Sequence, residues 1–237
     1  MSSNNTAIWL YGSYARGDED IYSDLDLLVV DNELVDLEKI ELPVKNPHTK
    51  ISLSQYTWYE IERMASYGSL FLHHLSCEAK PILESEGVKG KLFKILHQLG
   101  LYLKAKRDLE GFKLAISDVE ESIKSNCSFH YELSVLATIL RHSSILGCYV
   151  TTGQPIFGRN KPIETLVNLW NLDPMIYADF NDLYFFKLHG DRINALSSVI
   201  EIEYVLLWCA RIKFILKQLE KQVNIYERNL LKTNPTT

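Results

Sequence analysis

The sequence predicts an α+β fold, in which a small domain built on a mixed sheet is followed by an all-α helical bundle. Short apolar runs bounded by glycine or acidic residues mark the first part of the chain, whereas apolar residues recur at helical spacing in the second part. The boundary is expected at Ser85-Glu86-Gly87, which gives domains of residues 1–87 and 88–237. A chain of 237 residues with 46% hydrophobic content can bury a core in each.

Two apolar runs near the N-terminus predict buried strands. Ala7–Tyr11 stops at Gly12, and Leu25–Val30 begins directly after Asp24. A third strand is expected at Thr49–Ser54, where alternation places its polar side chains on one face and its apolar side chains on the other. The polar set is Lys50, Ser52 and Ser54, and the apolar set is Ile51 and Leu53.

The remaining elements of the first domain are two helices and an edge strand. The helices are expected at residues 55–64 and 69–75. Residues 78–84 contain Pro81, which lacks an N–H donor and therefore favours an edge strand or a connection over a central strand.

The second domain is predicted as an antiparallel bundle. Apolar residues recur there at three- and four-residue intervals, and residues 195–222 form a long, broadly apolar segment. Two glycines and two prolines predict a loop within residues 151–162. The helical repeat is clearest at Phe112, Ile116, Val119 and Ile123.

A turn followed by an acidic pair is the most informative pattern in the chain. The turn is Tyr11-Gly12-Ser13-Tyr14-Ala15-Arg16-Gly17, and ten residues separate Ser13 from Asp24-Leu25-Asp26. A glycine lets the backbone approach a phosphate, a serine and a helix start offer donors, and Arg16 adds a charged contact. In an extended strand, aspartates two residues apart point to the same side, and their hard oxygens suit Mg²⁺ or Mn²⁺.

This pattern resembles the signature of the DNA polymerase beta-like nucleotidyltransferase superfamily, especially its minimal and kanamycin nucleotidyltransferase-like branches, which carry a C-terminal HEPN-like helical domain. The resemblance implies a metal-dependent enzyme that moves a nucleoside monophosphate from an NTP such as ATP to an acceptor hydroxyl and releases pyrophosphate. It implies that Asp24 and Asp26 are catalytic and bind the metal. The residues expected to contact the nucleotide are Gly12, Ser13, Arg16 and Ser23.

The sequence departs from the superfamily in one respect. A third carboxylate is expected from a later strand, yet Thr49–Ser54 contains no acidic residue. Other candidates for that role are Asp31, Asp36, Glu38 and Glu60. The alternative is a catalytically silent nucleotide-binding or regulatory protein, and the plainest alternative is a strand-turn-strand in which Gly12 serves the turn, Ser23 caps it and the aspartates are solvated.

The acceptor stays open among a protein, a tRNA, an oligonucleotide and a small molecule such as an aminoglycoside. Residues 1–90 hold 7 Lys and Arg against 15 Asp and Glu, whereas residues 91–237 hold 18 against 15. The acidic part permits attraction of a cationic antibiotic, and the minimal branch of the family implies toxin–antitoxin or phage-defence chemistry. Arg141, Arg159 and Lys161 either contact the nucleotide or acceptor or are solvated loop charges.

Other features of the sequence bear on cellular location, on the state of the cysteines and on oligomerisation. The first six residues are polar and no apolar run approaches the length of a membrane span, so a cytoplasmic protein without a membrane partner is expected. The four cysteines form no C-x-x-C pair and are expected to be reduced. The final helix, with Trp208, Phe214 and Leu216, is expected either within the bundle or at a homo-oligomer interface.

Overall fold

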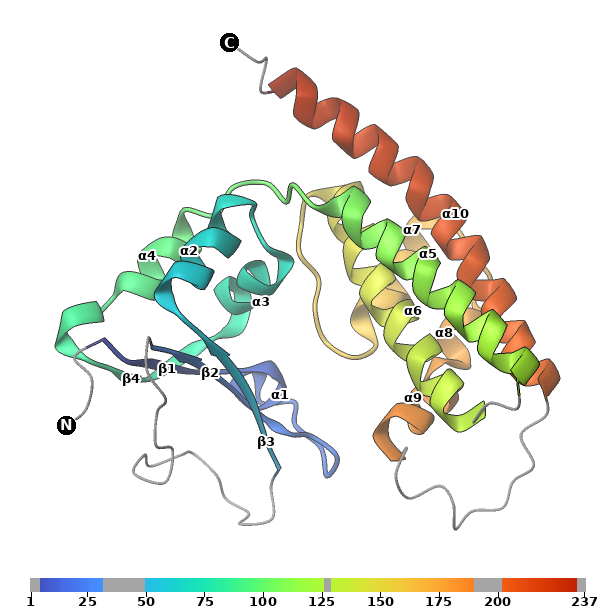
Figure 1. Ribbon diagram of the computed structural model, residues 1–237, viewed down its shortest axis with the longest axis horizontal. Helices are drawn as coiled ribbons and strands as arrows, with labels where there is room; N and C mark the ends of the chain where they lie inside the picture. Colours follow the sequence, from blue (N-terminus) through green and yellow to red (C-terminus); the bar gives the residue numbers. More distant parts are fainter. Residues whose placement is uncertain (1–4, 32–49, 126–128, 190–201, 234–237) are drawn as a thin grey trace. The chain divides into compact units, whose positions relative to one another are not determined.

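The computed structural model describes residues 5–31, 50–125, 129–189 and 202–233. The chain divides into two compact units, Met1–Leu103 and Lys104–Thr237 (Figure 1). The sheet lies in the first unit and the second is helical, which confirms the predicted α+β class.

The first unit is built on a mixed sheet of four strands in the order β3-β2-β1-β4. Strand β1 is antiparallel to both of its neighbours, and β2 is parallel to β3. The proline-containing strand β4 lies at an edge, as predicted. The strands are β1 (Ala7–Tyr11), β2 (Leu25–Val30), β3 (Ile51–Tyr56) and β4 (Lys80–Glu84).

Figure 1 shows α2, α3 and α4 gathered on one side of this sheet. Apolar side chains from alternate positions of β1 and β2 pack there against the three helices, while Leu10, Leu25 and Leu27 pack with Ala15 of α1 in a separate cluster. The helices of this unit are α1 (Gly12–Arg16), α2 (Trp58–Ser66), α3 (Leu70–Glu78), the 3₁₀ turn η2 (Glu86–Val88) and α4 (Lys91–His97).

Helix α2 begins later than the sequence predicted. Gln55 and Tyr56 belong to β3, and Thr57 caps the helix: its hydroxyl accepts from the Glu60 N–H at 3.2 Å, and the Glu60 carboxylate accepts from the Thr57 N–H at 2.8 Å. This reciprocal capping box satisfies two N–H groups that the first turn leaves without helical partners.

The first unit extends past the predicted boundary at residue 87. Helix α4 contributes Leu92 and Leu96 to the same core cluster as Trp58 of α2 and Leu72 of α3. Burial of these two leucines ties α4 to the sheet domain. The compact units divide after Leu103, while the boundary at residue 87 stays a prediction from sequence.

The second unit is a helical bundle around α6. This helix packs against α5, α7, α9 and α10, and Leu133, Leu140 and Leu146 along it are fully buried. The loop predicted between residues 151 and 162 lies between α6 and α7. The helices are α5 (Ala105–Ser122), the 3₁₀ turn η3 (Ile123–Ser125), α6 (Phe129–Thr152), α7 (Lys161–Trp170), α8 (Met175–Ala178), α9 (Phe180–His189) and α10 (Ile202–Thr233).

Helix α6 has the length and composition of a membrane-spanning helix, with a mean hydropathy of 1.4 in its most apolar window. It is the one helix with this property among the described residues. However, 72% of that window is buried against the rest of the protein. This burial is what a central helix of a bundle requires. Residues 195–201 of the predicted long terminal segment lie outside the described residues, and α10 itself starts at Ile202.

Candidate functional site

Strand pairing places Asp26 between β1 and β3. Its residue partners are Tyr11 on β1 and Ser52 on β3, and its side chain is half-buried. The pKa of Asp26 is raised, first by burial and then by the negative charges of Asp24 and Glu78, although a hydrogen bond with Ser52 opposes the shift. The half-buried charge of Asp26 is therefore costly unless a cation offsets it.

Gly12 allows the Asp26 carboxylate to lie directly over the end of β1. The glycine has φ +76°, a backbone conformation that L side chains rarely adopt. A Cβ atom at this position would lie 2.2 Å from Oδ2 of Asp26. The glycine predicted to approach a phosphate is thus also the residue that makes room for a carboxylate.

Asp24 lies just before β2 and is half-buried. Pairing of the strand begins at the next residue, where the Leu25 N–H donates to the Lys50 carbonyl at 2.8 Å. The negative charge of Asp24 acts on Asp26, so the two predicted metal ligands share one local environment. Among the described residues, no group of three or more His, Cys, Asp or Glu side chains could hold a metal ion. The site therefore offers a pair of carboxylates.

Glu78 is the site residue that sequence reasoning missed. It is the last residue of α3, and its side chain is only 6% exposed. The carboxylate accepts from the Gly12 N–H at 2.5 Å and from Nη1 of Arg16 at 2.7 Å, and it lies 2.8 Å from Nε2 of His74. The two groups predicted to hold a phosphate, a backbone N–H and a guanidinium, thus meet an internal carboxylate.

The pKa of Glu78 is lowered. Burial is the largest influence and by itself raises it, but the hydrogen bonds and positive charges of His74 and Arg16 together outweigh burial. A pair four residues apart at a helix end, His74 and Glu78, was the sequence signal for this residue. The sequence analysis had instead assigned Glu78 to the following strand.

The other predicted nucleotide contacts serve the local fold. The carbonyl of Ser13 accepts from the N–H groups of Gly17 and Asp18 and closes α1. Ser23 holds a turn, since its hydroxyl accepts from the Asp20 N–H and donates to the Asp20 carboxylate, both at 2.9 Å. The structure brings Gly12, Arg16 and Asp26 together around Glu78, and Ser23 shapes the loop that leads into β2.

Two of the four candidates for a third carboxylate, Asp31 and Glu60, lie away from Asp26. Asp31 is buried at the far end of β2, where it accepts a hydrogen bond from the Thr6 hydroxyl. Glu60 caps α2 beyond the C-terminal end of β3. Asp36 and Glu38 lie outside the described residues. At the position of β3 that pairs with Asp26, the chain has Ser52.

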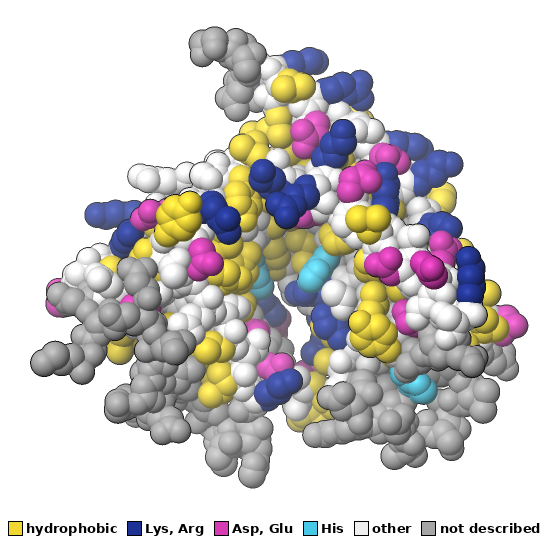
Figure 2. Space-filling model, viewed as in Figure 1, with side chains coloured by type: hydrophobic (Ala, Val, Ile, Leu, Met, Phe, Trp, Pro, Cys, Tyr) yellow, Lys and Arg dark blue, Asp and Glu magenta, His cyan; other side chains and the backbone are white. Residues whose placement is uncertain are grey.

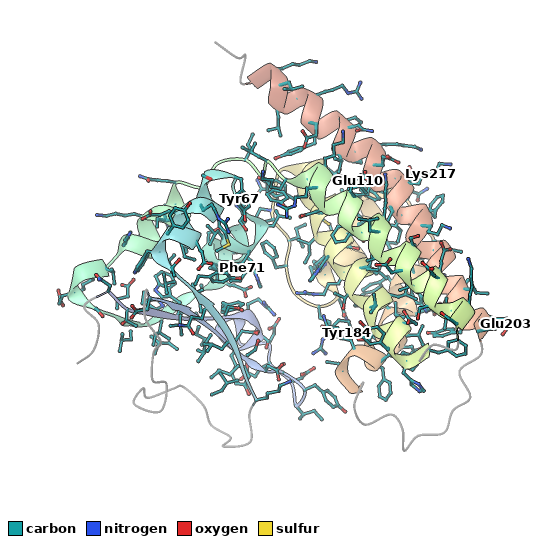
Figure 3. The ribbon with its side chains drawn as sticks, in the orientation of Figure 1. Tyr67, Phe71, Glu110, Tyr184, Glu203 and Lys217 are labelled. Carbon is teal, nitrogen blue, oxygen red and sulfur yellow. The ribbon has the colours of Figure 1, made fainter. Side chains whose placement is uncertain are left out.

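The helical unit contains a second group of ionisable side chains, which we call the basic cluster: Arg141 and His142 of α6, Arg159 of the loop before α7, and Lys187 of α9. Arg141 donates to the Gly158 carbonyl at 2.9 Å, and this contact ties the loop to α6. The Arg159 guanidinium and the Lys187 ammonium lie 5.3 and 5.4 Å from the centre of the Tyr184 ring, which Figure 3 labels on α9.

Like charges act on one another within the basic cluster. Burial, followed by the charge of Arg141, lowers the pKa of Lys187. Burial lowers the pKa of His142 to about 4, and the charges of Arg141 and Lys187 add to this effect, although the residue as a whole is exposed by its accessible surface. Lys161, the third basic residue expected in this region, pairs instead with Glu164 at 3.0 Å on α7.

Comparison with known proteins finds a family match within the first unit. Residues 1–71 match the family model of the nucleotidyltransferase domain, in agreement with the resemblance to the polymerase beta-like superfamily. The match spans β1, β2, β3 and α2, and therefore includes the glycine turn and both aspartates. No curated protein sequence matches the chain.

Two solved structures are similar to the whole chain in outline. One is a spectinomycin adenyltransferase from Enterococcus faecialis with ATP and spectinomycin; it is 14% identical, 91% of this chain and 93% of that chain are covered, and the TM-score is 0.48. The other is a nucleotidyltransferase-like protein from Exiguobacterium sibiricum 255-15, with 15% identity, coverage of 97% and 74%, and a TM-score of 0.33. At these TM-scores neither likeness bears on the function.

Proposed function

We propose that this chain, whose residues 1–71 form a nucleotidyltransferase domain, transfers a nucleoside monophosphate from an NTP to the hydroxyl of an acceptor. The observation that carries the proposal is the contact between Gly12 and Asp26. A left-handed glycine at the end of β1 leaves room for a half-buried carboxylate whose pKa is raised by burial and then by a second carboxylate. That arrangement is costly for the fold alone and useful where a cation and a phosphate meet.

Asp24 and Asp26 would hold a divalent cation, Mg²⁺ or Mn²⁺. The donor set fits such an ion, because Mg²⁺ is commonly held by one or two carboxylates and completes its shell with water and phosphate oxygens. A cation would also offset the burial and mutual repulsion that raise the pKa of Asp26. When bound, it would orient the reacting groups and neutralise charge on the leaving pyrophosphate.

The residues around Glu78 would receive the triphosphate. Gly12 would present its backbone N–H and Arg16 its guanidinium, and phosphate oxygens would replace the Glu78 carboxylate at these two donors. In the transfer itself, the acceptor oxygen bonds to the α-phosphorus and the bond to the β-phosphate oxygen breaks. Pyrophosphate leaves with the bonding electrons, and the hydroxyl proton passes to a nearby carboxylate or to water.

The basic cluster favours a ligand that carries phosphate. Besides burial, the charges of Arg141 and Lys187 disfavour protonation of His142, and Arg141 disfavours protonation of Lys187, so an anion among them would offset the repulsion. Among the candidate acceptors, tRNA and an oligonucleotide carry phosphate. A protein or an aminoglycoside as acceptor, and a role in toxin–antitoxin or phage defence, stay within the proposal.

A transfer assay tests the proposal. The protein is incubated with each α-³²P-labelled NTP or dNTP and Mg²⁺ or Mn²⁺, alone and with tRNA, cell extract or aminoglycosides. We expect label in an acceptor for the wild type and none for the Asp24→Asn/Asp26→Asn variant. If nucleotide binds under all these conditions and no label moves, the alternative of a catalytically silent nucleotide-binding protein holds instead.

A further inference from the structure

Helix α10 buries one side and exposes the other. Val205, Trp208, Ile212 and Leu219 are fully buried, and their three- to seven-residue spacing places them on the side that packs in the bundle. The helix is 32 residues long and packs mainly against α5 and α6. Its opposite side is available to a partner.

That opposite side carries apolar side chains at helical spacing. Leu206 is 46% exposed, Leu207 45% and Phe214 52%, and Ala210 between them is also exposed. At 100° per residue these four positions fall within one third of the helix circumference. We call them the α10 stripe. Figure 2 shows apolar side chains among acidic and basic ones on the right of the view, where Figure 1 places α5 and α10.

The α10 stripe is symmetric about Ala210. Leu206 and Phe214 lie four residues to either side of it, and Glu203 and Lys217 lie seven residues to either side. Glu203 and Lys217 are both exposed and share the angular range of the stripe (Figure 3). An identical helix running in the opposite direction would therefore set Leu206 against Phe214 and Glu203 against Lys217, each contact occurring twice.

Other charges of α10 are used within the unit. Lys213 pairs with Glu120 at 2.9 Å, and Glu220 pairs with Lys113 at 2.7 Å, both toward α5. These pairs flank the stripe on its α5 side. The ends of the stripe thus carry opposite charges, its middle is apolar, and its centre is a small residue that lets two helices approach closely.

We propose that α10 pairs with α10 of a second copy of this chain, antiparallel, about a two-fold axis beside Ala210. The surface is isologous, because the same residues on both copies complete one another. Apolar contact between Leu206, Leu207 and Phe214 supplies the association, and the two Glu203–Lys217 pairs select the antiparallel register over a parallel one. This inference is independent of the nucleotide site.

Sedimentation of the full-length protein across a range of concentrations tests the association. We expect a dimer for the wild type and a dissociation constant raised by about thirtyfold or more for Phe214→Asp, as for a central interface residue. Ile225→Asp is the matched control, since Ile225 has a similar exposure, 45%, but lies three turns beyond Phe214 along the same helix, away from the proposed axis. A monomeric wild type, or an equal effect of both variants, would overturn the proposal.

Two further variants test the register. Glu203→Lys and Lys217→Glu should each weaken the dimer a few-fold, and the double variant should restore it. An Ala210→Cys variant should form a disulfide-linked dimer on mild oxidation, because the two copies of this residue adjoin at the axis. Wild type and Ile225→Cys serve as controls. Failure of the double variant to recover, or equal cross-linking of Ile225→Cys, would exclude the proposed pairing.

Discussion

The end of β1 in the first unit and the basic cluster in the second each bring several ionisable side chains together. The pKa shifts have opposite effects on charge at these two places. At the end of β1, the Glu78 carboxylate contacts Arg16 and His74. Its pKa is lowered, which favours its charged form. In the basic cluster, the pKa values of Lys187 and His142 are lowered as well, first by burial, which for these bases favours the neutral form. The same direction of shift therefore favours the charged form of a carboxylate and the neutral form of two bases.

A second contrast lies within the first unit, between Asp26 and Glu78. Both are largely enclosed carboxylates, yet the pKa of Asp26 is raised and that of Glu78 is lowered. Glu78 has its cationic partners inside the chain, whereas Asp26 has a second aspartate beside it. This contrast supports the proposal of a cation at Asp26 and of a triphosphate that displaces Glu78.

The largest expected effect is on transfer. Asp24→Asn or Asp26→Asn should lower the rate by about a thousandfold, because several kcal/mol of transition-state stabilisation depend on the cation that these carboxylates would hold. The rate is measured with the acceptor that the labelling assay identifies. Glu19→Gln is the control, because Glu19 is an exposed carboxylate in the loop between α1 and β2, and this variant should keep near-wild-type activity. Retention of activity by both aspartate variants would contradict the assignment of the metal site.

The substitution that should abolish transfer, Asp26→Asn, should not lower the stability of the metal-free protein. The raised pKa of Asp26 means that its ionised form costs stability in the folded protein, and this cost is present at pH values above the folded pKa. Without added metal, Asp26→Asn is therefore expected to unfold no more easily than the wild type at pH 7. A clear loss of stability would show that the Asp26 charge is already satisfied within the chain.

Two glycines with similar backbones separate the effect of crowding from that of strain. Gly12→Ala should destabilise the protein by about 3 kcal/mol, since the added Cβ meets the Asp26 carboxylate at a left-handed position. Gly17→Ala should cost only about 1 kcal/mol, because φ is +80° there but nothing lies within 4 Å of the added atom. Urea unfolding measures both. Equal losses would mean that Asp26 moves aside freely.

A third carboxylate added next to Asp26 should raise the affinity of the proposed metal site. Ser52→Asp places an acidic side chain beside Asp26 on β3 and should raise the affinity for Mn²⁺ by about tenfold, measured by calorimetry. Ser54→Asp is the control, because it lies two residues further along the same face and pairs with Leu28. If both variants gained affinity equally, general negative charge rather than the Asp26 position would be the cause.

The smallest expected effect concerns the basic cluster. Lys187→Met should raise the pKa of His142 above its value of about 4, because one of the two neighbouring positive charges is removed while burial and Arg141 still lower it. NMR titration of the ring follows this change, with Lys161→Met as a control outside the cluster. An unchanged pKa of His142 in Lys187→Met would show that the charge of Lys187 does not act on His142.

The pH dependence of stability follows from the same group. Since the pKa of His142 is lower in the folded state, the unfolded state takes up a proton first as the pH falls. Stability from this residue is complete above about pH 6.5 and is lost as the pH falls toward 4. Because the pKa of Glu78 is lowered in the folded state, Glu78 adds a further loss of stability as the pH falls below the ordinary pKa range of a glutamate. The wild type should therefore lose more stability between pH 7 and 4 than Lys187→Met.

Local patterns in the sequence determined much of the first unit. The apolar runs predicted β1 and β2 with correct bounds, and Pro81 predicted an edge strand. The glycine turn and Asp24-Leu25-Asp26 identified the nucleotidyltransferase domain, and β3 carries no acidic residue, as predicted. These features depend on residues close together in the chain, where backbone preference and side-chain alternation act directly.

Tertiary structure alone decided how distant residues meet. Glu78 reaches Gly12 and Arg16 across more than 60 residues of chain, and Lys187 acts on His142 from another helix. No periodicity predicts such contacts, because they depend on how packed helices and strands place their ends. The sequence therefore determined which strands and which motif form the site. The packing of α3 on the sheet decided which charges surround that site, and the packing of α9 on α6 decided separately which charges meet in the basic cluster.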